Sequence, residues 1–230
     1  MDAVYTLSNN YAGEELRYSL RSLANLPHDK VFFVGGCPKW AQGVLHIPTE
    51  QKGTKYKNTT NNLKISCHDP RLSDDFIYMN DDFFILQPTK PDDLNFNCGT
   101  VESVLEILFK KKRYITPYMS GAEKTRDLLR FNGVPEPLSY ELHIPFIFNK
   151  YKFLDMFNLK GIDNIACLHK RTLYGNLYNK RGEYMKDVKV FNSGGFSGKT
   201  GRFLSCSNNG FPIIENFLKK QFPNKCAYEI

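Results

Sequence analysis

The sequence of 230 residues lacks the short motifs that mark several large classes of enzyme. It contains no GxxxxGKS or GxxxxGKT phosphate loop and no GxGxxG fingerprint, which argues against P-loop and dinucleotide-binding sites. It also contains no GxSxG elbow, the signature of the α/β-hydrolases. Its six cysteines form no CxxC pair, so we expect reduced, mostly buried thiols rather than a structural zinc site or a disulfide framework.

Long hydrophobic runs are absent too. The longest apolar stretches are far shorter than the roughly 20 residues of a membrane-spanning helix. Met1 is followed by Asp2 rather than by a basic and then apolar leader, so we expect a cytoplasmic protein without a membrane partner. Hydrophobic residues make up 41% of the chain and charged residues 24%, which is ordinary for a globular protein with a sizeable core.

The charge of the chain is biased to one sign. Lysine and arginine number 31 against 24 acidic residues, which gives a formal net charge of +7. This surplus favours an anionic partner such as nucleic acid, a nucleotide or a phosphorylated substrate. A basic surface that only aids solubility would have the same net charge. Charge alone therefore does not decide between an anionic partner and a solubilising surface.

The first part of the chain has the pattern of a βαβ unit. A β-prone run at 2–7 is followed by helix-spaced leucines with two early glutamates at 13–28, and then by an apolar run at 30–36. Strand, helix and strand with short joints predict a parallel sheet covered by helices.

The rest of the chain is less regular. We expect an irregular polar stretch at 37–60, a third strand at 76–79 and a long functional loop at 117–140. Further expected elements are a strand at 141–148 and helices at 61–67, 101–109, 124–130, 152–157, 163–178 and 213–220. No clean linker divides the sequence. We therefore predict one domain over 1–230, with a nucleotide-binding half at 1–90 and an acceptor-binding half at 91–230.

The sharpest chemical signal is a pair of acids inside the apolar run FIYMNDDFFIL, residues 76–86. Burying a carboxylate is costly unless it is paired or bound to metal. Ligands of open α/β sheets bind at the carboxyl ends of strands, so the first and third strands predict a crevice there. Its residues would be Tyr5, Thr6, Asn9, Asn80, Asp81 and Asp82.

Two carboxylates at a strand end can hold Mg²⁺ or Mn²⁺ together with diphosphate oxygens. Neighbouring residues on a strand point to opposite faces, unless the chain turns there. We therefore assign Asp82 to the metal, and Asn80 and Asp81 to the nucleotide and its geometry. The alternative is a turn with solvated aspartates.

Glu141 and His143 alternate on the strand expected at 141–148 and so face the same side. A carboxylate beside an imidazole suits general-base chemistry or a metal ligand with its support, whereas a structural histidine is the alternative. Lys170 and Arg171 are candidates to meet diphosphate or acceptor phosphates, or form a solvated helix face.

Two other segments each allow two interpretations of their function. The basic run 110–113 is either a nucleic-acid contact or a solvated turn. The glycine-rich segment 193–201 is either a phosphate-binding loop or a flexible surface loop, and no β-strand precedes it to favour the first.

Four blocks of residues 2–86 resemble a known family. MDAVYT, ELRYSLRSL, VFFVGGCPKW and DDFIYMNDDFF keep the order and approximate spacing of the Stealth-type transferases. The chain is also similar to the compact glycosyltransferases of bacteriophages, which share the ELRYSLRSL and NDDFF blocks. Both resemblances imply a GT-A-like α/β fold, with a Rossmann-type mixed, mostly parallel sheet and helices on both faces.

The resemblance also implies roles for individual residues. A divalent metal would lie at Asn80–Asp82, and Tyr5 and Thr6 would line the nucleotide site. The candidates for contacts to the base or diphosphate are Arg17, Arg21 and Lys64. His143 would be a catalytic or metal-associated histidine. The chain departs from the Stealth pattern at 7–10, where LSNN replaces a tryptophan-containing turn.

We therefore predict a glycosyltransferase that uses Mn²⁺ or Mg²⁺ and a nucleotide sugar, in particular a uridine diphosphate sugar. Glu141 or Asp81 would orient or deprotonate the acceptor hydroxyl. The acceptor would be a glycan or a hydroxylated base of phage DNA, in the host cytoplasm if a phage encodes the chain. One alternative is a Stealth-like sugar-1-phosphate transferase acting on a glycan, and another is a non-catalytic nucleic-acid-binding module.

Overall fold

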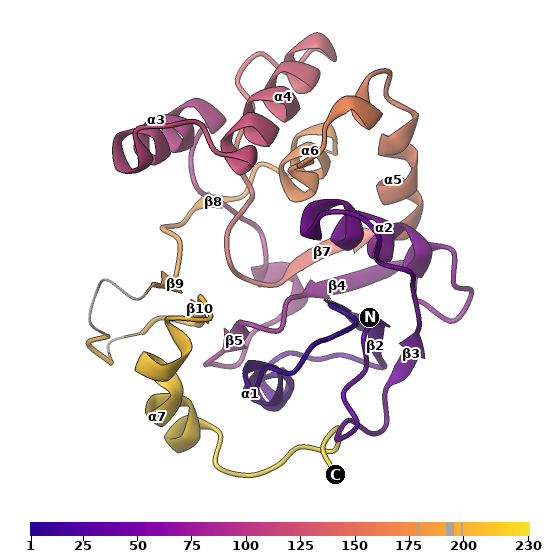
Figure 1. Ribbon diagram of the computed structural model, residues 1–230, viewed down its shortest axis with the longest axis vertical. Coiled ribbons are helices and arrows are strands. Elements are labelled where there is room, and N and C mark those ends of the chain that lie inside the picture. Colours follow the sequence, from indigo (N-terminus) through magenta and orange to yellow (C-terminus); the bar gives the residue numbers. More distant parts are fainter. Residues whose placement is uncertain (179, 192–195, 199) are drawn as a thin grey trace.

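The computed structural model describes residues 1–178, 180–191, 196–198 and 200–230 and is built around one mixed sheet (Figure 1). Five strands follow the order β3–β2–β1–β4–β7. β7 runs antiparallel to β4, and the other pairs are parallel, which confirms the predicted mixed, mostly parallel sheet. The strands are β1 Asp2–Leu7, β2 Val31–Gly35, β3 Leu45–Ile47, β4 Asp75–Met79 and β7 Phe146–Asn149.

The central strand β1 is apolar on both sides, as a strand covered on two faces must be. Val4 packs in one core cluster with Phe76, and Tyr5 packs in another with Ile77. Helix α2 (Lys55–Cys67) covers the first face and α1 (Glu15–Ser22) covers the second, as Figure 1 shows. The prediction of helices on both faces is confirmed.

Two helices begin earlier than the sequence pattern indicates, because a threonine caps each of them. Thr54 accepts a hydrogen bond from Lys57 N, so α2 begins within the stretch 37–60 that we expected to be irregular, and β3 lies there too. Thr116 accepts one from Met119 N, and Pro117 occupies the first helical turn. The expected loop at 117–140 is therefore wrong for its first half, which forms α4 (Pro117–Phe131).

The remaining helices are close to their predicted places. Helix α3 pairs with α4 as a hairpin at one end of the molecule, far from the C-terminus (Figure 1). The helix expected at 163–178 is shorter than predicted and is preceded by a 3₁₀ turn, Ile162–Asn164. The bounds are α3 Val101–Lys112, α5 Lys150–Asp155, α6 Lys170–Leu177 and α7 Phe211–Gln221.

A second sheet joins distant parts of the chain. Its strands are β5 (Phe83–Ile85), β10 (Phe203–Cys206) and β9 (Lys189–Val190), in that order. The short strands β6 (Phe96–Asn97) and β8 (Glu183–Tyr184) pair separately. The apolar run 76–86 is therefore not one strand but two, which belong to different sheets and meet at the aspartates.

Three further expectations can be compared with the structure. The six cysteines are free, and three of them are buried. Within the described residues, no helix combines the length and the apolarity needed to cross a membrane. The glycine-rich segment 193–201 lies in part outside the described residues.

Candidate active site

The chain reverses direction at Asn80–Asp82, between β4 and β5. Phe83 N donates to Asn80 O at 3.3 Å and closes the turn. The Ser19 hydroxyl of α1 lies 3.2 Å from Asn80 O and 2.7 Å from Phe83 O, so it pins the turn to the helix. Because the two aspartates lie in a turn, the rule that neighbours on a strand face opposite ways does not separate them.

Asp82 is held by one of its two oxygens. Its Oδ2 accepts from Lys189 Nζ at 2.8 Å and from Ser205 Oγ at 3.3 Å, whereas its buried Oδ1 has no hydrogen-bond partner among the described residues. The second sheet brings these groups together, because Ser205 of β10 pairs with Phe83 on one side and Lys189 on the other. The predicted halves 1–90 and 91–230 both contribute to this contact.

Asp81 lies in an unfavourable environment for its negative charge. Burial, and then the charge of Asp82, raise the pKa of Asp81 to about 7. The Tyr11 hydroxyl is a hydrogen-bonding partner of Asp81 and also accepts from Leu16 N at 3.2 Å. Glu15 adds further negative charge nearby. Within the part of the chain that the structure describes, these acids thus outnumber the lysine that pairs with them, Lys189.

The two aspartates fit a hard divalent cation. Such ions bind carboxylate oxygens, and the buried, unpartnered Oδ1 of Asp82 is an oxygen of that kind. Among the described residues, no three His, Cys, Asp or Glu side chains form a cluster suited to a metal. A bound diphosphate and water can supply further ligands. The prediction that His143 is a metal ligand beside Asp82 is not supported.

His143 lies beside the turn but has a different partner. Its Nδ1 is 2.8 Å from Asp187 Oδ2, and its backbone N donates to Asp187 Oδ1 at 3.0 Å. Its ring packs edge-on against Phe83, with centroids 6.3 Å apart. Residues 141–145 are irregular, so the predicted strand that placed Glu141 and His143 on one face is wrong there.

Glu141 is a structural residue rather than a base. Its carboxylate accepts from Arg171 Nε and Nη2 at 3.1 and 3.0 Å and from the backbone N of Arg171 and Thr172 at 3.1 and 3.2 Å. Although burial opposes it, the charge of Arg171 lowers the pKa of Glu141 to about 2. The prediction of Glu141 as a general base is therefore wrong. Arg171 is 7% exposed and bound to Glu141, so it is not free for a phosphate.

The role of Lys170 as a phosphate or acceptor contact stays a prediction. It begins α6, and its Nζ lies 5.8 Å from the ring centre of Tyr78, close to the carboxyl end of β4. Burial lowers the pKa of Lys170 to about 8. It is therefore a cation near the predicted crevice whose charge the surroundings only partly stabilise.

The carboxyl end of β1 contributes fewer side chains to the predicted crevice than expected. Tyr5 is fully buried, with its hydroxyl 3.1 Å from Ser19 Oγ, so its side chain belongs to the core and does not line a nucleotide site. Thr6 is half-buried at the same strand end. Asn9 N donates to Gln51 Oε1 at 3.1 Å, and Asn9 Nδ2 donates to Thr49 O at 3.0 Å. Asn9 thus joins the ends of β1 and β3 at the carboxyl edge of the sheet.

The three cations predicted for the base or diphosphate have structural partners instead. Arg17 and Arg21 both bind Glu229, at 3.2 and 2.6 Å, and so fasten the C-terminal segment to α1. Lys64 Nζ lies over the ring of Phe157, 4.4 Å from its centroid. These assignments are corrected, because charge spacing along one helix does not show which segment packs against it.

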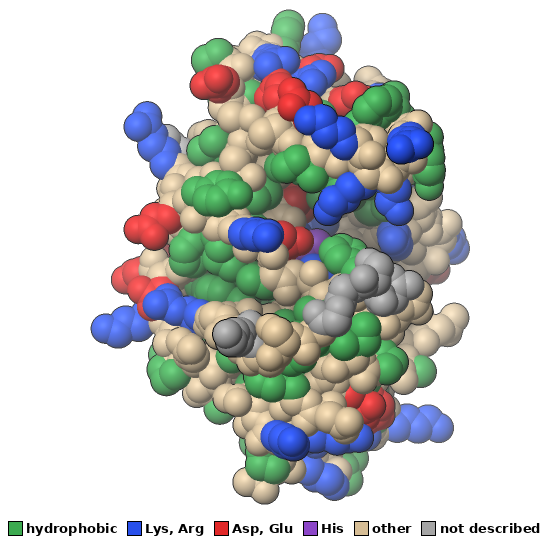
Figure 2. All heavy atoms as spheres, turned by 90° about the vertical axis from the view of Figure 1, so that its left-hand side faces the viewer, with side chains coloured by type: hydrophobic (Ala, Val, Ile, Leu, Met, Phe, Trp, Pro, Cys, Tyr) green, Lys and Arg blue, Asp and Glu red, His purple; other side chains and the backbone are tan. Residues whose placement is uncertain are grey.

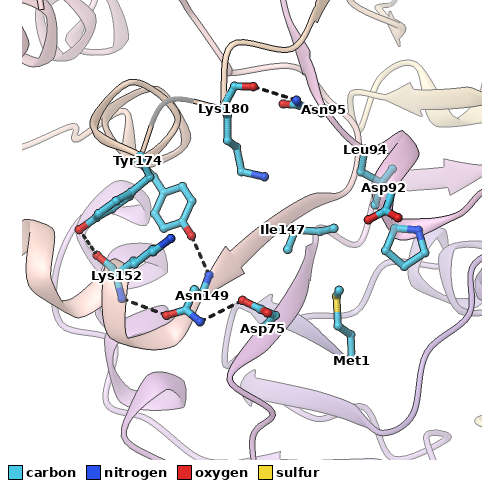
Figure 3. Close-up of a pocket in the computed structure, with 12 residues that line it drawn as sticks. Met1, Asp75, Asp92, Leu94, Asn95, Ile147, Asn149, Lys152, Tyr174 and Lys180 are labelled. Carbon is cyan, nitrogen blue, oxygen red and sulfur yellow. Dashed lines mark hydrogen bonds between the residues drawn. The ribbon is translucent and has the colours of Figure 1, made fainter.

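The molecular surface agrees with a site near the second sheet. The face that carries β8 and β9 is hollowed near its middle, where acidic, basic and histidine side chains lie together (Figure 2). A separate cavity of about 370 Å³ lies at the opposite end of β4 and includes Asp75, Ile147 and Lys180 in its lining. Figure 3 shows Lys180 extending into it. None of the predicted site residues lines this cavity.

Sequence reasoning missed four residues of the site: Tyr11, Asp187, Lys189 and Ser205. Tyr11 directly follows the polar residues after β1, so its position along the chain could have indicated it. Of the other three, Lys189 and Ser205 lie in the short strands β9 and β10, and Asp187 lies just before β9. The local pattern of these segments carries no chemical signal.

Comparison with known proteins adds evidence on the fold. No protein-family model matches the chain, and no curated protein matches it. A structure of the galactosyltransferase LgtC with donor and acceptor sugar analogs matches with a TM-score of 0.53 and 11% identity, over 99% of this chain and 97% of that one. An active-site mutant of LgtC matches with a TM-score of 0.53 and 10% identity, over 96% and 95%. The chain therefore has the α/β fold of the GT-A glycosyltransferases over nearly its whole length.

Proposed function

We propose that this protein is a metal-dependent glycosyltransferase that takes a sugar from a nucleotide-sugar donor, with uridine diphosphate sugars as the first candidates. The observation that carries the proposal is the unpartnered, buried Oδ1 of Asp82 in a turn shared with Asp81. The turn lies at the carboxyl edge of a sheet with a glycosyltransferase fold, where such folds bind ligands. A carboxylate oxygen kept out of water is costly unless a hydrogen bond or a cation offsets that cost.

The residues of the site divide the work of the reaction. A divalent metal bound by Asp82 and Asp81 would neutralise the diphosphate leaving group. Lys189 and Lys170 supply further positive charge at the same edge of the sheet. Tyr11 holds Asp81 in place. These groups act on the donor rather than on the acceptor.

His143 replaces Glu141 as the candidate general base. With its proton on Nδ1 and directed at Asp187, the imidazole presents Nε2 as a proton acceptor. The acceptor would then lose its hydroxyl proton to His143 as the sugar is transferred. The positive net charge supports an anionic acceptor, for which a phosphorylated glycan and a hydroxylated base of DNA are candidates.

The proposal is tested with a panel of nucleotide sugars, each incubated with Mn²⁺ or Mg²⁺. We expect metal-dependent release of nucleoside diphosphate from one donor class, and loss of release in Asp82→Asn. The matched control is Asp163→Asn, which neutralises an exposed aspartate on a distant turn. Release of nucleoside monophosphate would instead indicate sugar-1-phosphate transfer. Tight DNA binding with no turnover of any donor would indicate a nucleic-acid-binding module.

A further inference from the structure

The contact between Lys189 and Asp82 places a positive charge where a metal-binding carboxylate lies. The side chains are 15% and 16% exposed, and the ammonium is 2.8 Å from Oδ2. The described residues show no second acid within ion-pair distance of Lys189 and no second cation within that distance of Asp82. The pair is therefore the main charge compensation of this carboxylate in the protein alone.

The pairing of β9 with β10 fixes the position of Lys189. β9 pairs in register with β10, so Lys189 lies next to Ser205, the second partner of Asp82 Oδ2. Two residues earlier, Asp187 binds both the ring and the backbone of His143. The segment 187–190 thus contacts both Asp82, through Lys189, and His143, through Asp187.

A divalent cation at Asp82 Oδ1 would add two positive charges within a few ångströms of this ammonium. In a partly buried site such charges repel strongly because water screens them poorly. A nucleoside diphosphate reverses the balance, since its negative oxygens can accept from the lysine and bind the metal at once.

We propose that Lys189 couples metal binding to donor binding: it opposes the metal when the site has no diphosphate and assists it when diphosphate is present. The inference rests on the proposed function, because it assumes a metal and a nucleotide at this turn. Lys189 is then the counter-ion of Asp82 in the free protein and a diphosphate contact in the complex. The metal and the donor consequently bind together rather than one without the other.

The test is the affinity for Mn²⁺ with and without uridine diphosphate, measured by titration calorimetry on the full chain. We expect Lys189→Gln to bind Mn²⁺ alone about tenfold more tightly than the natural protein, a change equal to about 1.4 kcal/mol. Uridine diphosphate should then raise the Mn²⁺ affinity less in this variant. Lys189→Arg should keep the coupling, and Lys186→Gln, which removes an exposed lysine three residues away, should leave both affinities unchanged.

Thermal unfolding supplies a second readout. In chelator, Lys189→Gln should melt at a lower temperature than the natural protein, because Asp82 loses its counter-ion, and Mn²⁺ should restore more of its stability. Weaker or unchanged Mn²⁺ binding in Lys189→Gln would overturn the proposal, because Lys189 would then only orient Asp82. If the coupling is found but no donor is turned over, the proposed function fails and the coupling stands. If no variant binds Mn²⁺ with or without the nucleotide, both fail.

Discussion

Two clusters of half-buried carboxylates, one at Glu141 and one at Asp81 and Asp82, show that the same chemical group is fully hydrogen-bonded in one place and only partly so in another. Glu141 accepts four hydrogen bonds, from the Arg171 guanidinium and from the start of α6, and its pKa falls to about 2. Among the described residues, Asp82 pairs with Lys189 through Oδ2 and its Oδ1 has no partner, and the pKa of Asp81 rises to about 7. A saturated acid stabilises the fold, whereas an unsaturated one favours the arrival of a cation.

The largest expected effect is on catalysis, from a substitution in the Asp81–Asp82 pair. Asp82→Asn should lower donor turnover by about a thousandfold or more, because the metal loses one of its two proposed carboxylates and the leaving group loses its charge compensation. The melting temperature should change little, because the loss of the ion pair with Lys189 is offset by the removal of the repulsion between Asp81 and Asp82. Steady-state turnover and thermal unfolding on the same samples measure both. Retained turnover would move the metal away from Asp82.

At Glu141, whose hydrogen bonds are complete, a substitution should instead reduce the stability of the fold. Glu141→Gln should destabilise the protein by about 3–5 kcal/mol, because Arg171 is left as a buried, uncompensated charge. Denaturant unfolding gives the value. The double variant Glu141→Gln with Arg171→Met should recover part of the loss, and an equal loss in both variants would show that the pair is not what the fold depends on.

The pH dependence of stability separates the clusters further. The pKa of Glu141 is lowered to about 2 in the folded chain, so its contribution is complete above the unfolded value near 4.5 and is lost as the pH falls toward 2. The loss should amount to roughly 3 kcal/mol. Denaturant unfolding from pH 6 to pH 2 measures it. Glu141→Gln should flatten this slope, and Asp163→Asn should not.

The smallest expected effect is a gain rather than a loss of stability. Asp81→Asn removes the repulsion between two neighbouring carboxylates, so we expect the metal-free protein to gain about 1 kcal/mol of stability at pH 8. The same variant should bind Mn²⁺ more weakly in the presence of uridine diphosphate. A loss of stability would mean that the ionised form of Asp81 is already well compensated without metal.

The fold was predictable from local patterns in the first half of the chain. The apolar strands at 2–7, 31–35 and 76–79 and the leucine spacing of α1 are local properties, and the structure keeps them. Asp81 and Asp82 were noticed for the same reason, since acids inside an apolar run stand out in the sequence, but the turn that holds them was only the alternative. The predicted starts of α2 and α4 were too late. Their N-caps, Thr54 and Thr116, begin each helix before the apolar periodicity of the sequence becomes visible.

The sequence by itself determined which residues could be buried and where acids interrupt them, because burial follows from hydrophobicity and spacing. Only the tertiary structure decided which charges meet. Lys189 and Ser205 reach Asp82 across 107 and 123 residues of chain, and Arg21 reaches Glu229 across 208. A basic residue has the same local signature whether it pairs with Asp82 in the turn or binds Glu229 near the C-terminus. Its role depends on the partner that packing brings within about 3 Å, at which distance electrostatic and hydrogen-bond energies are large.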